Sequence, residues 1–298
     1  MSEKLLEVAQ LTKEYQGFKL GPVDLTIEPG EIVGMVGANG AGKTTLMKCI
    51  LGLTRRNSGD LRLFGQNAPE GATPAMRNDI GVVLDACQLP KAFKPKDVRV
   101  LMRNAYANWD QATFEKVSAQ LGVSDYKDVG SLSRGMGMKL SMAVALSHSP
   151  KLLLLDEATA GLDPMVRDEV LEMLRRYIDS ADAGILLCTH ITSDLEKAAD
   201  RVVCLNNGKV VFSECRETIT DMAGIARCRQ ADLDLLYETD LFETCDPRFL
   251  HGPYGIDVLV PDRFDFAKRI QGIPCDRCSI EDYMRFMLKG DQLYEVKA

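Results

Sequence analysis

The chain has 298 residues, of which 46% are hydrophobic and 27% are charged, an ordinary composition for a globular protein with a sizeable core. Its 43 acidic residues outnumber the 36 basic ones, and no segment concentrates Lys and Arg as a reader of nucleic-acid phosphates would. The charged amino terminus and the lack of an apolar run of roughly 20 residues argue against a signal peptide and a membrane span. We therefore expect a soluble protein that does not bind nucleic acid.

In chain order, the first clear pattern is a predicted strand at residues 31–37, followed by a glycine-rich loop. Residues 44–53 then carry apolar side chains at helical spacing. Residues 87–149 look different, because helical patterns dominate there and no convincing strand is found. The predicted helices of this segment cover residues 97–107, 112–121 and 135–147. We interpret the segment as a helical subdomain inserted into a different core.

Two further buried strands are predicted at residues 152–155 and 185–188, and Pro164 stands in the first turn of a helix between them. Asn207 and Gly208 separate two β-branched runs, which predicts a hairpin. Strands that alternate with helices predict an α/β fold with a largely parallel sheet.

The pattern changes again from about residue 216. Residues 256–260 predict a strand. Ser279 is followed three residues later by Asp282, which predicts a capping box at the start of a helix that stops near Gly290. We expect residues 216–298 to form a folded extension.

Residues 37–44 match the phosphate-loop pattern G-x-x-x-x-G-K-[ST] at every fixed position. Glycines let consecutive backbone N–H groups point at phosphate oxygens, and the helix that follows adds its positive end. Lys43 is placed to reach the β- and γ-phosphates and Thr44 to ligate Mg²⁺. A chance match is disfavoured by the strand–loop–helix context. The residues expected to hold ATP here are Gly37, Ala38, Asn39, Gly40, Ala41, Gly42, Lys43, Thr44 and Thr45.

Asp156 and Glu157 follow the buried strand at residues 152–155. An Asp at this place can hold the Mg²⁺ shell opposite Thr44. If the chain turns after the strand, Glu157 can face the γ-phosphate and orient or deprotonate the attacking water. The alternative is a solvated acidic pair that caps the next loop. Ser133, shortly before this strand, either presents an anion site at a helix start or is a simple N-cap.

These motifs, in this order and spacing, resemble the nucleotide-binding subunits of ABC transporters over about residues 1–215. Residues 132–136, Leu-Ser-Arg-Gly-Met, resemble the family signature Leu-Ser-Gly-Gly-Gln. Residues 160–163, Ala-Gly-Leu-Asp, resemble the D-loop. His190 resembles the switch histidine, and Tyr15 resembles the aromatic residue that stacks on adenine.

The resemblance implies an α/β phosphate-loop NTPase core with an N-terminal antiparallel part, a helical subdomain at about residues 87–149 and a small α+β C-terminal extension. It also implies that two ATPase subunits enclose two ATP molecules with Mg²⁺. Each ATP would lie between the phosphate loop of one subunit and Ser133 and Gly135 of the other. The pair would drive separate transmembrane permease subunits from the inner face of the cell membrane.

The resemblance also assigns roles to single residues. Glu157 would be the general base, His190 would contact the γ-phosphate together with Lys43, and Asp163 would link the two sites across the dimer. Each assignment has a plainer alternative. His190 can be a buried strand-end histidine, Tyr15 a surface aromatic, and Asp163 only the cap of the helix that starts at Pro164.

Two of the departures from the family pattern introduce a charge. The family's Mg²⁺-sensing Gln falls at Asp85, while Gln88 lies three residues further on as a substitute. An Asp can still touch Mg²⁺ through water. Arg134 replaces a signature glycine, so its cation either meets the partner's ATP or covers the surface. Some exporter-type ATPases with separate membrane subunits show both departures, which favours export.

The nine cysteines are scattered, odd in number and partly within apolar stretches, so we expect reduced, buried thiols in a cytoplasmic protein. Cys275 and Cys278 have the spacing of a zinc or redox pair, with Cys228 and Cys245 as further candidates. Without a second such pair, a dimerisation or regulatory role for residues 216–298 is favoured over a metal site. This extension resembles, more loosely, those of bacterial exporter and antibiotic-resistance ATPases.

The alternative class is a non-transport ATPase of the same superfamily that acts on nucleic acid or the ribosome. Lys43 and Asp156 are too close in sequence for the long coiled-coil insertion of the DNA-repair type, and the chain has one cassette where the ribosomal type has two. A small-molecule kinase would not explain Ser133, Asp163 and His190 together. The sequence does not identify the transported molecule.

Overall fold

The computed structural model describes residues 3–233, 236, 242, 248–252 and 255–292. The chain forms two compact units. The first contains residues 1–199 and 205–210, and the second contains residues 200–204 and 211–298. The proposed domain limits at residues 215 and 216, and those of the helical subdomain, stay predictions. None of the described helices is long and apolar enough to cross a bilayer.

The first unit is built on a parallel sheet of strands β3 (Ile32–Val36), β8 (Gly184–Thr189), β7 (Leu152–Asp156) and β6 (Ile80–Val83), which are neighbours in that order. All residues of β3, β7 and β8 are buried, which explains their unbroken apolar sequences. Because the strands are parallel, their carboxyl ends meet at one edge of the sheet. The predicted parallel core is therefore confirmed.

An antiparallel sheet lies before this core in the chain. Its strands β1 (Leu6–Tyr15), β2 (Phe18–Ile27), β4 (Ser58–Leu63) and β5 (Gln66–Asn67) are ordered β2-β1-β4-β5. Buried and exposed side chains alternate along the second half of β4, as expected when one face of a sheet packs on a core. The expected N-terminal antiparallel part is confirmed.

Outside residues 87–149, the helices of this unit are α1 (Lys43–Ile50), α2 (Pro74–Arg77), α6 (Pro164–Ser180) and α7 (Thr192–Ala198). Helix α1 begins inside the phosphate-loop motif, one residue earlier than predicted. Pro164 occupies the first turn of α6, as predicted, since its missing N–H has no helical partner there.

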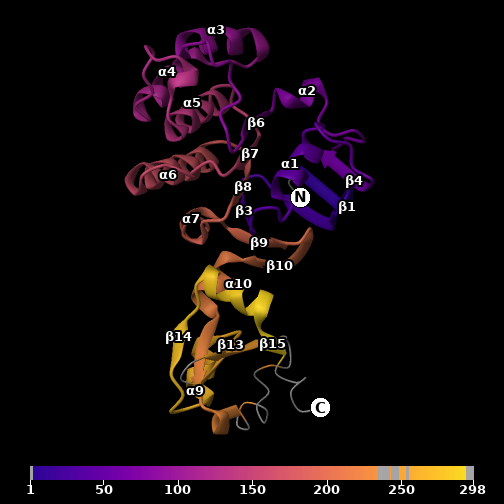
Figure 1. Ribbon diagram of the computed structural model, residues 1–298, viewed down its shortest axis with the longest axis vertical. Coiled ribbons are helices and arrows are strands. Elements are labelled where there is room, and N and C mark those ends of the chain that lie inside the picture. Colours follow the sequence, from indigo (N-terminus) through magenta and orange to yellow (C-terminus); the bar gives the residue numbers. More distant parts are fainter. Residues whose placement is uncertain (1–2, 234–235, 237–241, 243–247, 253–254, 293–298) are drawn as a thin grey trace. The chain divides into compact units, whose positions relative to one another are not determined.

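Residues 87–149 contain α3 (Pro95–Ala105), α4 (Gln111–Gln120), the 3₁₀ turn η1 (Val129–Ser131) and α5 (Arg134–Leu146), and no strand. Figure 1 shows α3, α4 and α5 grouped together. The three predicted helices are confirmed to within two residues at each end. Asp110 and Ser133 accept backbone N–H bonds at the starts of α4 and α5, and Asp97 accepts from the N–H of Lys94 at the start of α3.

The predicted hairpin is formed by β9 (Arg201–Asn206) and β10 (Lys209–Cys215). Both central residues of its turn have left-handed backbones, with φ of 47° at Asn207 and 78° at Gly208. This conformation is the one that Asn-Gly favours in two-residue hairpins.

The second unit contains an antiparallel sheet of five strands in the order β14 (Cys275–Arg277), β11 (Gly224–Cys228), β13 (Gly255–Val260), β12 (Arg248–Gly252) and β15 (Asp291–Gln292). The other elements of this unit are the π-helical turn η2 (Thr218–Met222), the 3₁₀ turn η3 (Gln230–Asp232), and the helices α9 (Arg263–Arg269) and α10 (Ile280–Lys289).

Both faces of this sheet are covered. Ala226 and Val258 belong to a cluster with Phe266 of α9, whereas their neighbours Ile225 and Leu259 belong to a cluster with Phe286 of α10. Adjacent residues of a strand point to opposite faces, so the two clusters lie on opposite sides of the sheet. The predicted strand at residues 256–260 is β13, and the expected small α+β extension is confirmed.

Candidate functional site

The phosphate loop connects β3 to α1. At Gly42, the residue before α1, φ is 116°, and a Cβ atom there would lie 2.8 Å from Cδ1 of Leu20. Only glycine fits this combination of backbone and space. The loop is held from inside, because Nζ of the buried Lys43 donates to the carbonyl oxygen of Gly37 at 2.6 Å.

A cleft of about 470 Å³ lies over this loop. The residues that line it come from the loop, from α1, from the acidic pair and from two other places. They are Phe18, Ala38, Asn39, Gly40, Ala41, Gly42, Lys43, Thr44, Thr45, Asp85, Asp156 and Glu157. The structure thus gathers nearly all of the phosphate-loop residues and the acidic pair in one cleft.

Thr44 and Asp156 meet inside the cleft. The Thr44 hydroxyl donates to Oδ2 of Asp156 at 2.5 Å. Burial raises the pKa of the Asp156 carboxyl, which the Thr44 hydrogen bond partly opposes. A hydroxyl and a carboxylate are the hard oxygen donors that Mg²⁺ prefers, and Mg²⁺ usually takes its other ligands from water and substrate phosphates. The donor set therefore fits Mg²⁺ bound together with a nucleotide.

Glu157 follows β7 with a left-handed backbone, at a φ of 53°. Such a conformation in a residue other than glycine is strained and is often found at functional sites. It makes the chain turn directly after Asp156, so that both carboxylates line the cleft. One oxygen of Glu157 lies 2.7 Å from Nδ1 of His190, and the other lies 3.7 Å from Nζ of Lys43.

His190, which follows β8, is brought to Glu157 because β7 and β8 are adjacent parallel strands. Its side chain is 55% exposed, so His190 is not a buried strand-end histidine. The arrangement is a base-like carboxylate with an exposed imidazole at its side. It can hold a water molecule between protein and γ-phosphate.

A second hydrogen-bonded pair connects the segment after β7 to helix α7. The Thr159 hydroxyl donates to Oδ2 of Asp194 at 2.6 Å, and both side chains are buried. Thr159 lies two residues after Glu157, and Asp194 lies four residues after His190. Burial raises the pKa of Asp194, and the Thr159 bond opposes this. Neither residue belongs to a recognised motif, and their pairing depends on tertiary structure alone.

Tyr15, expected at the adenine, lies at the end of β1 opposite Phe18, across the turn to β2. It is 47% exposed, and Nζ of Lys13 lies 5.0 Å from its ring centre. Phe18, and not Tyr15, lines the cleft. The sequence did contain a signal for Phe18, since a ring three residues from Tyr15 in a hairpin shares its end of the sheet.

Ser133, Gly135 and Asp163 are not among the residues that line the cleft of their own chain. Ser133 accepts from the N–H of Met136 at 3.3 Å and caps α5, and Asp163 accepts from the N–H of Val166 at 3.2 Å and caps α6. Both residues therefore cap helices, and their roles at a partner's ATP stay predictions. Gly135 packs tightly, because a Cβ there would lie 3.0 Å from the carbonyl oxygen of Gly161.

Asp85 lies just beyond β6 and lines the cleft, whereas Gln88 does not. Gln88 instead donates through Nε2 to the carbonyl oxygen of Ala86 at 3.3 Å. The Asp85 carboxylate also forms an ion pair with the guanidinium of Arg134. Of the two candidates for the family's glutamine position, Asp85 is the one beside Thr44 and Asp156.

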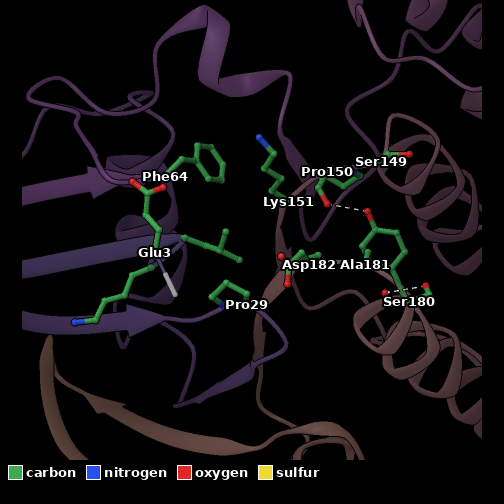
Figure 2. A pocket seen from close by; sticks show the side chains of 13 residues that line it. Glu3, Pro29, Phe64, Ser149, Pro150, Lys151, Ser180, Ala181 and Asp182 are labelled. Atoms are coloured by element: carbon green, nitrogen blue, oxygen red, sulfur yellow. Dashed lines mark hydrogen bonds between the residues drawn. The ribbon is translucent and has the colours of Figure 1, made fainter. Parts of the chain in front are cut away.

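A second cavity of about 640 Å³ lies in the same unit (Figure 2). It is lined by segments that precede β7 and β8, including Lys151 and Ala183, and by the end of α6. It therefore lies at the amino ends of these strands, whereas ligands of open α/β sheets bind at the carboxyl ends. The Tyr177 hydroxyl donates to the carbonyl oxygen of Pro150 at 2.7 Å, and burial raises the pKa of Tyr177 to about 12.

The cysteine pair of the extension is split between two elements. Cys275 begins β14, and the buried Cys278 lies just before α10. Among the described residues, no group of three or more His, Cys, Asp or Glu side chains is placed to hold a metal ion. Cys245, the other candidate, lies outside the described residues.

Comparison with known proteins places these features in a family. The family model described as "ABC transporter" matches residues 20–160. The Nod factor export ATP-binding protein I of Rhizobium leguminosarum bv. viciae is 33% identical over 218 residues, which cover 71% of this chain and 69% of that protein. The molybdenum import ATP-binding protein ModC 1 of Azotobacter vinelandii is 30% identical and covers 80% of this chain and 68% of its own length.

The fold agrees with these matches. A solved structure of the ATP-binding subunit of an ABC transporter superposes with a TM-score of 0.65 at 29% identity, and the alignment covers 72% of this chain and 91% of that one. The phosphate loop, the acidic pair and the helical insertion lie within the matched region. The chain belongs to the ATP-hydrolysing, ATP-binding subunits of ABC transporters.

Proposed function

We propose that this chain pairs with a second ATPase subunit around two Mg²⁺·ATP and powers export through separate permease subunits at the inner face of the cell membrane. The observation that carries the proposal is the position of Ser133 and Gly135. Both belong to the signature-like segment, and both lie outside the cleft of their own chain. A second copy that presents this segment would complete the site.

Within the cleft, each side chain has a defined task. Lys43 and the loop N–H groups bind the β- and γ-phosphates, and Thr44 and Asp156 would hold Mg²⁺. Mg²⁺ supplies charge neutralisation of the phosphates. Glu157 accepts a proton from the attacking water, and His190 orients Glu157 and reaches toward the γ-phosphate. Asp163 would link the two sites across the dimer, and Tyr15 would stack on adenine from the end of the β1–β2 hairpin.

Export is favoured by residues, not by the names of relatives, since those compared include both an exporter and an importer. Asp85 in place of the usual Gln and Arg134 in place of a signature Gly are the departures shared with exporter-type ATPases. The folded extension of residues 216–298 points the same way, and we assign it to dimerisation or regulation.

The central test of the site is Glu157→Gln. This variant should bind ATP as the wild type does and accumulate as an ATP-bound dimer. Its hydrolysis rate should fall by a factor of about 10²–10⁴. Turnover, nucleotide binding and sedimentation in the presence of Mg²⁺·ATP measure the three effects. Glu172→Gln, at an exposed ion pair on α6, is the matched control. Normal hydrolysis by Glu157→Gln would rule out Glu157 as the base.

The partner is tested by pull-down from detergent-solubilised membranes with the tagged full chain. Recovery of a protein with many membrane spans is the expected result. Recovery of ribosomes or DNA instead would overturn the transport proposal in favour of the non-transport class of this superfamily.

A further inference from the structure

The two charged departures from the family pattern contact each other. Asp85 lies in the loop after β6, and Arg134 is the first residue of α5, far away in sequence. Their carboxylate and guanidinium form an ion pair. A glycine at position 134 could not form it, and a glutamine at position 85 would form only a neutral contact. The pair is therefore specific to this combination of residues.

Arg134 is placed between three functional segments. Its guanidinium reaches Asp85, while its aliphatic stem covers Gly161, where a Cβ would lie 3.6 Å from Cδ of Arg134. Gly161 belongs to the D-loop-like segment, and Ser133, next to Arg134, belongs to the signature-like segment. Asp85 lines the phosphate cleft, and both Asp85 and Arg134 line a neighbouring pocket of about 330 Å³. One side chain thus connects the cleft of a subunit to the surface expected to meet its partner.

The ion pair restrains Arg134 only weakly, so a better partner can replace it. The side chains of Arg134 and Asp85 are 56% and 59% exposed. Exposed pairs of this kind shift equilibria by only about one- to fivefold. A guanidinium binds phosphate oxygens through paired, charge-assisted hydrogen bonds, and a triphosphate carries several negative charges. When such a group comes within reach, it should displace the single carboxylate.

We propose that Asp85 holds Arg134 in the separate subunit and releases it to the phosphates of the ATP bound by the partner subunit. The proposal rests on the composite site proposed above. Asp85 is then a positioning residue that opposes closure of the dimer, and Arg134 is the group it restrains. Closure of one dimer breaks two such ion pairs and binds two ATP molecules, which is one pair for each ATP. The ATP concentration at which half of the chains are dimeric should therefore change by the same factor as the equilibrium constant of a single ion pair.

The test is a double-mutant cycle in the hydrolysis-deficient Glu157→Gln chain. Asp85→Asn, Arg134→Gln and the combination of both are compared with the parent by sedimentation, with ATP titrated at fixed Mg²⁺ and protein concentrations. Asp85→Asn should lower the ATP concentration for half-maximal dimer about two- to fivefold. Arg134→Gln should raise it, and adding Asp85→Asn to Arg134→Gln should change nothing further.

Asp168→Asn is the matched control, because Asp168 forms an ion pair of similar exposure with Lys197 and lies outside the cleft. It should leave the midpoint unchanged. Melting temperatures verify that every variant is folded, and Asp85→Ala replaces Asp85→Asn if the latter is unstable.

Three results would overturn the inference: no effect of Asp85→Asn, a raised midpoint, or the same shift with and without Arg134. The last two are the results expected if Asp85 acts through Mg²⁺ instead of Arg134. If the Glu157→Gln parent forms no ATP-dependent dimer, the proposed function itself fails, and this inference fails with it. If the parent dimerises and Asp85→Asn has no effect, only the inference fails.

Discussion

Thr159 and Asp194 show how single residues away from the substrate set the geometry of the site. Their buried hydrogen bond of 2.6 Å joins the loop that carries Glu157 to the segment that carries His190. Neither side chain lines the cleft. If the bond is lost, the two segments are no longer fixed to each other, and the buried carboxylate of Asp194 loses its hydrogen-bond donor.

We therefore expect Thr159→Val to reduce kcat roughly ten- to a hundredfold, the scale of a misplacement of about 1 Å, while ATP affinity stays unchanged. Steady-state kinetics and nucleotide binding separate the two quantities. Thr159→Ser keeps the hydroxyl and should restore most of kcat. A loss of affinity equal to the loss in kcat would show that the pair acts on binding.

His148 makes the stability of the first unit depend on pH. Its ring is fully buried, stacks on Tyr106 with a centroid distance of 4.0 Å and bonds through Nδ1 to the carbonyl oxygen of Asn78 at 3.0 Å. Burial lowers the pKa of His148 below its ordinary value. The unfolded chain then binds a proton at a higher pH than the folded one, so stability is lost as pH falls below about 6.5.

His148→Gln should remove part of this loss. The melting temperature, followed by the fluorescence of Trp109, the single tryptophan, should fall less between pH 7.5 and 5.5 in the variant than in the wild type. His251→Gln, at an exposed histidine of the second unit, should not change the slope. An identical slope for His148→Gln and the wild type would contradict the assignment.

At the scale of elements, helix α10 depends on its cap. Ser279 accepts from the N–H of Asp282 at 3.0 Å, as the predicted capping box requires. The second half of the box differs from the prediction, because Oδ2 of Asp282 accepts from the Ser279 hydroxyl at 2.6 Å. The single cap stabilises α10, and Phe286 of this helix packs in the core on one face of the five-stranded sheet.

Ser279→Ala should destabilise α10 by about 0.5–2 kcal/mol, the usual cost of losing an N-cap. Hydrogen exchange of the α10 amides should become roughly two- to thirtyfold faster, if they exchange by local opening. Ser213→Ala, at an exposed position on β10 in the same unit, serves as the control. Unchanged exchange in α10 would show that packing of Phe286 alone holds the helix.

At the scale of the whole molecule, the residues that bind ATP and the extension belong to different compact units. Every residue that lines the phosphate cleft lies between positions 18 and 157, in the first unit. The second unit has its own sheet and its own core on both faces. Binding of a single nucleotide should therefore not require the extension, whereas dimerisation should if our assignment of residues 216–298 is right.

A chain ending at Arg216 should bind ATP with unchanged affinity and form a weaker ATP-dependent dimer than the full chain. Nucleotide binding and sedimentation of both chains in the Glu157→Gln background measure these effects. Circular dichroism establishes that the shortened chain is folded. Equal dimerisation of both chains would exclude the dimerisation role and leave regulation.

The sequence by itself determined the local features of this protein. The phosphate loop, the acidic pair after a buried strand, the Asn-Gly hairpin and the helix caps are encoded within a few residues, where backbone preference and short-range hydrogen bonds decide the structure. Periodicity was sufficient for the parallel core and the three inserted helices, because burial on both faces or on one stripe leaves a distinct pattern.

Only the tertiary structure decided which distant residues meet. The Thr159–Asp194 bond and the Asp85–Arg134 ion pair each join segments that no local pattern connects. The structure also separated Ser133 and Gly135 from the cleft of their own chain. The physical reason is that such contacts are set by the register of parallel strands and the packing of helices on them. These properties belong to the assembled sheet and to no single segment of the chain.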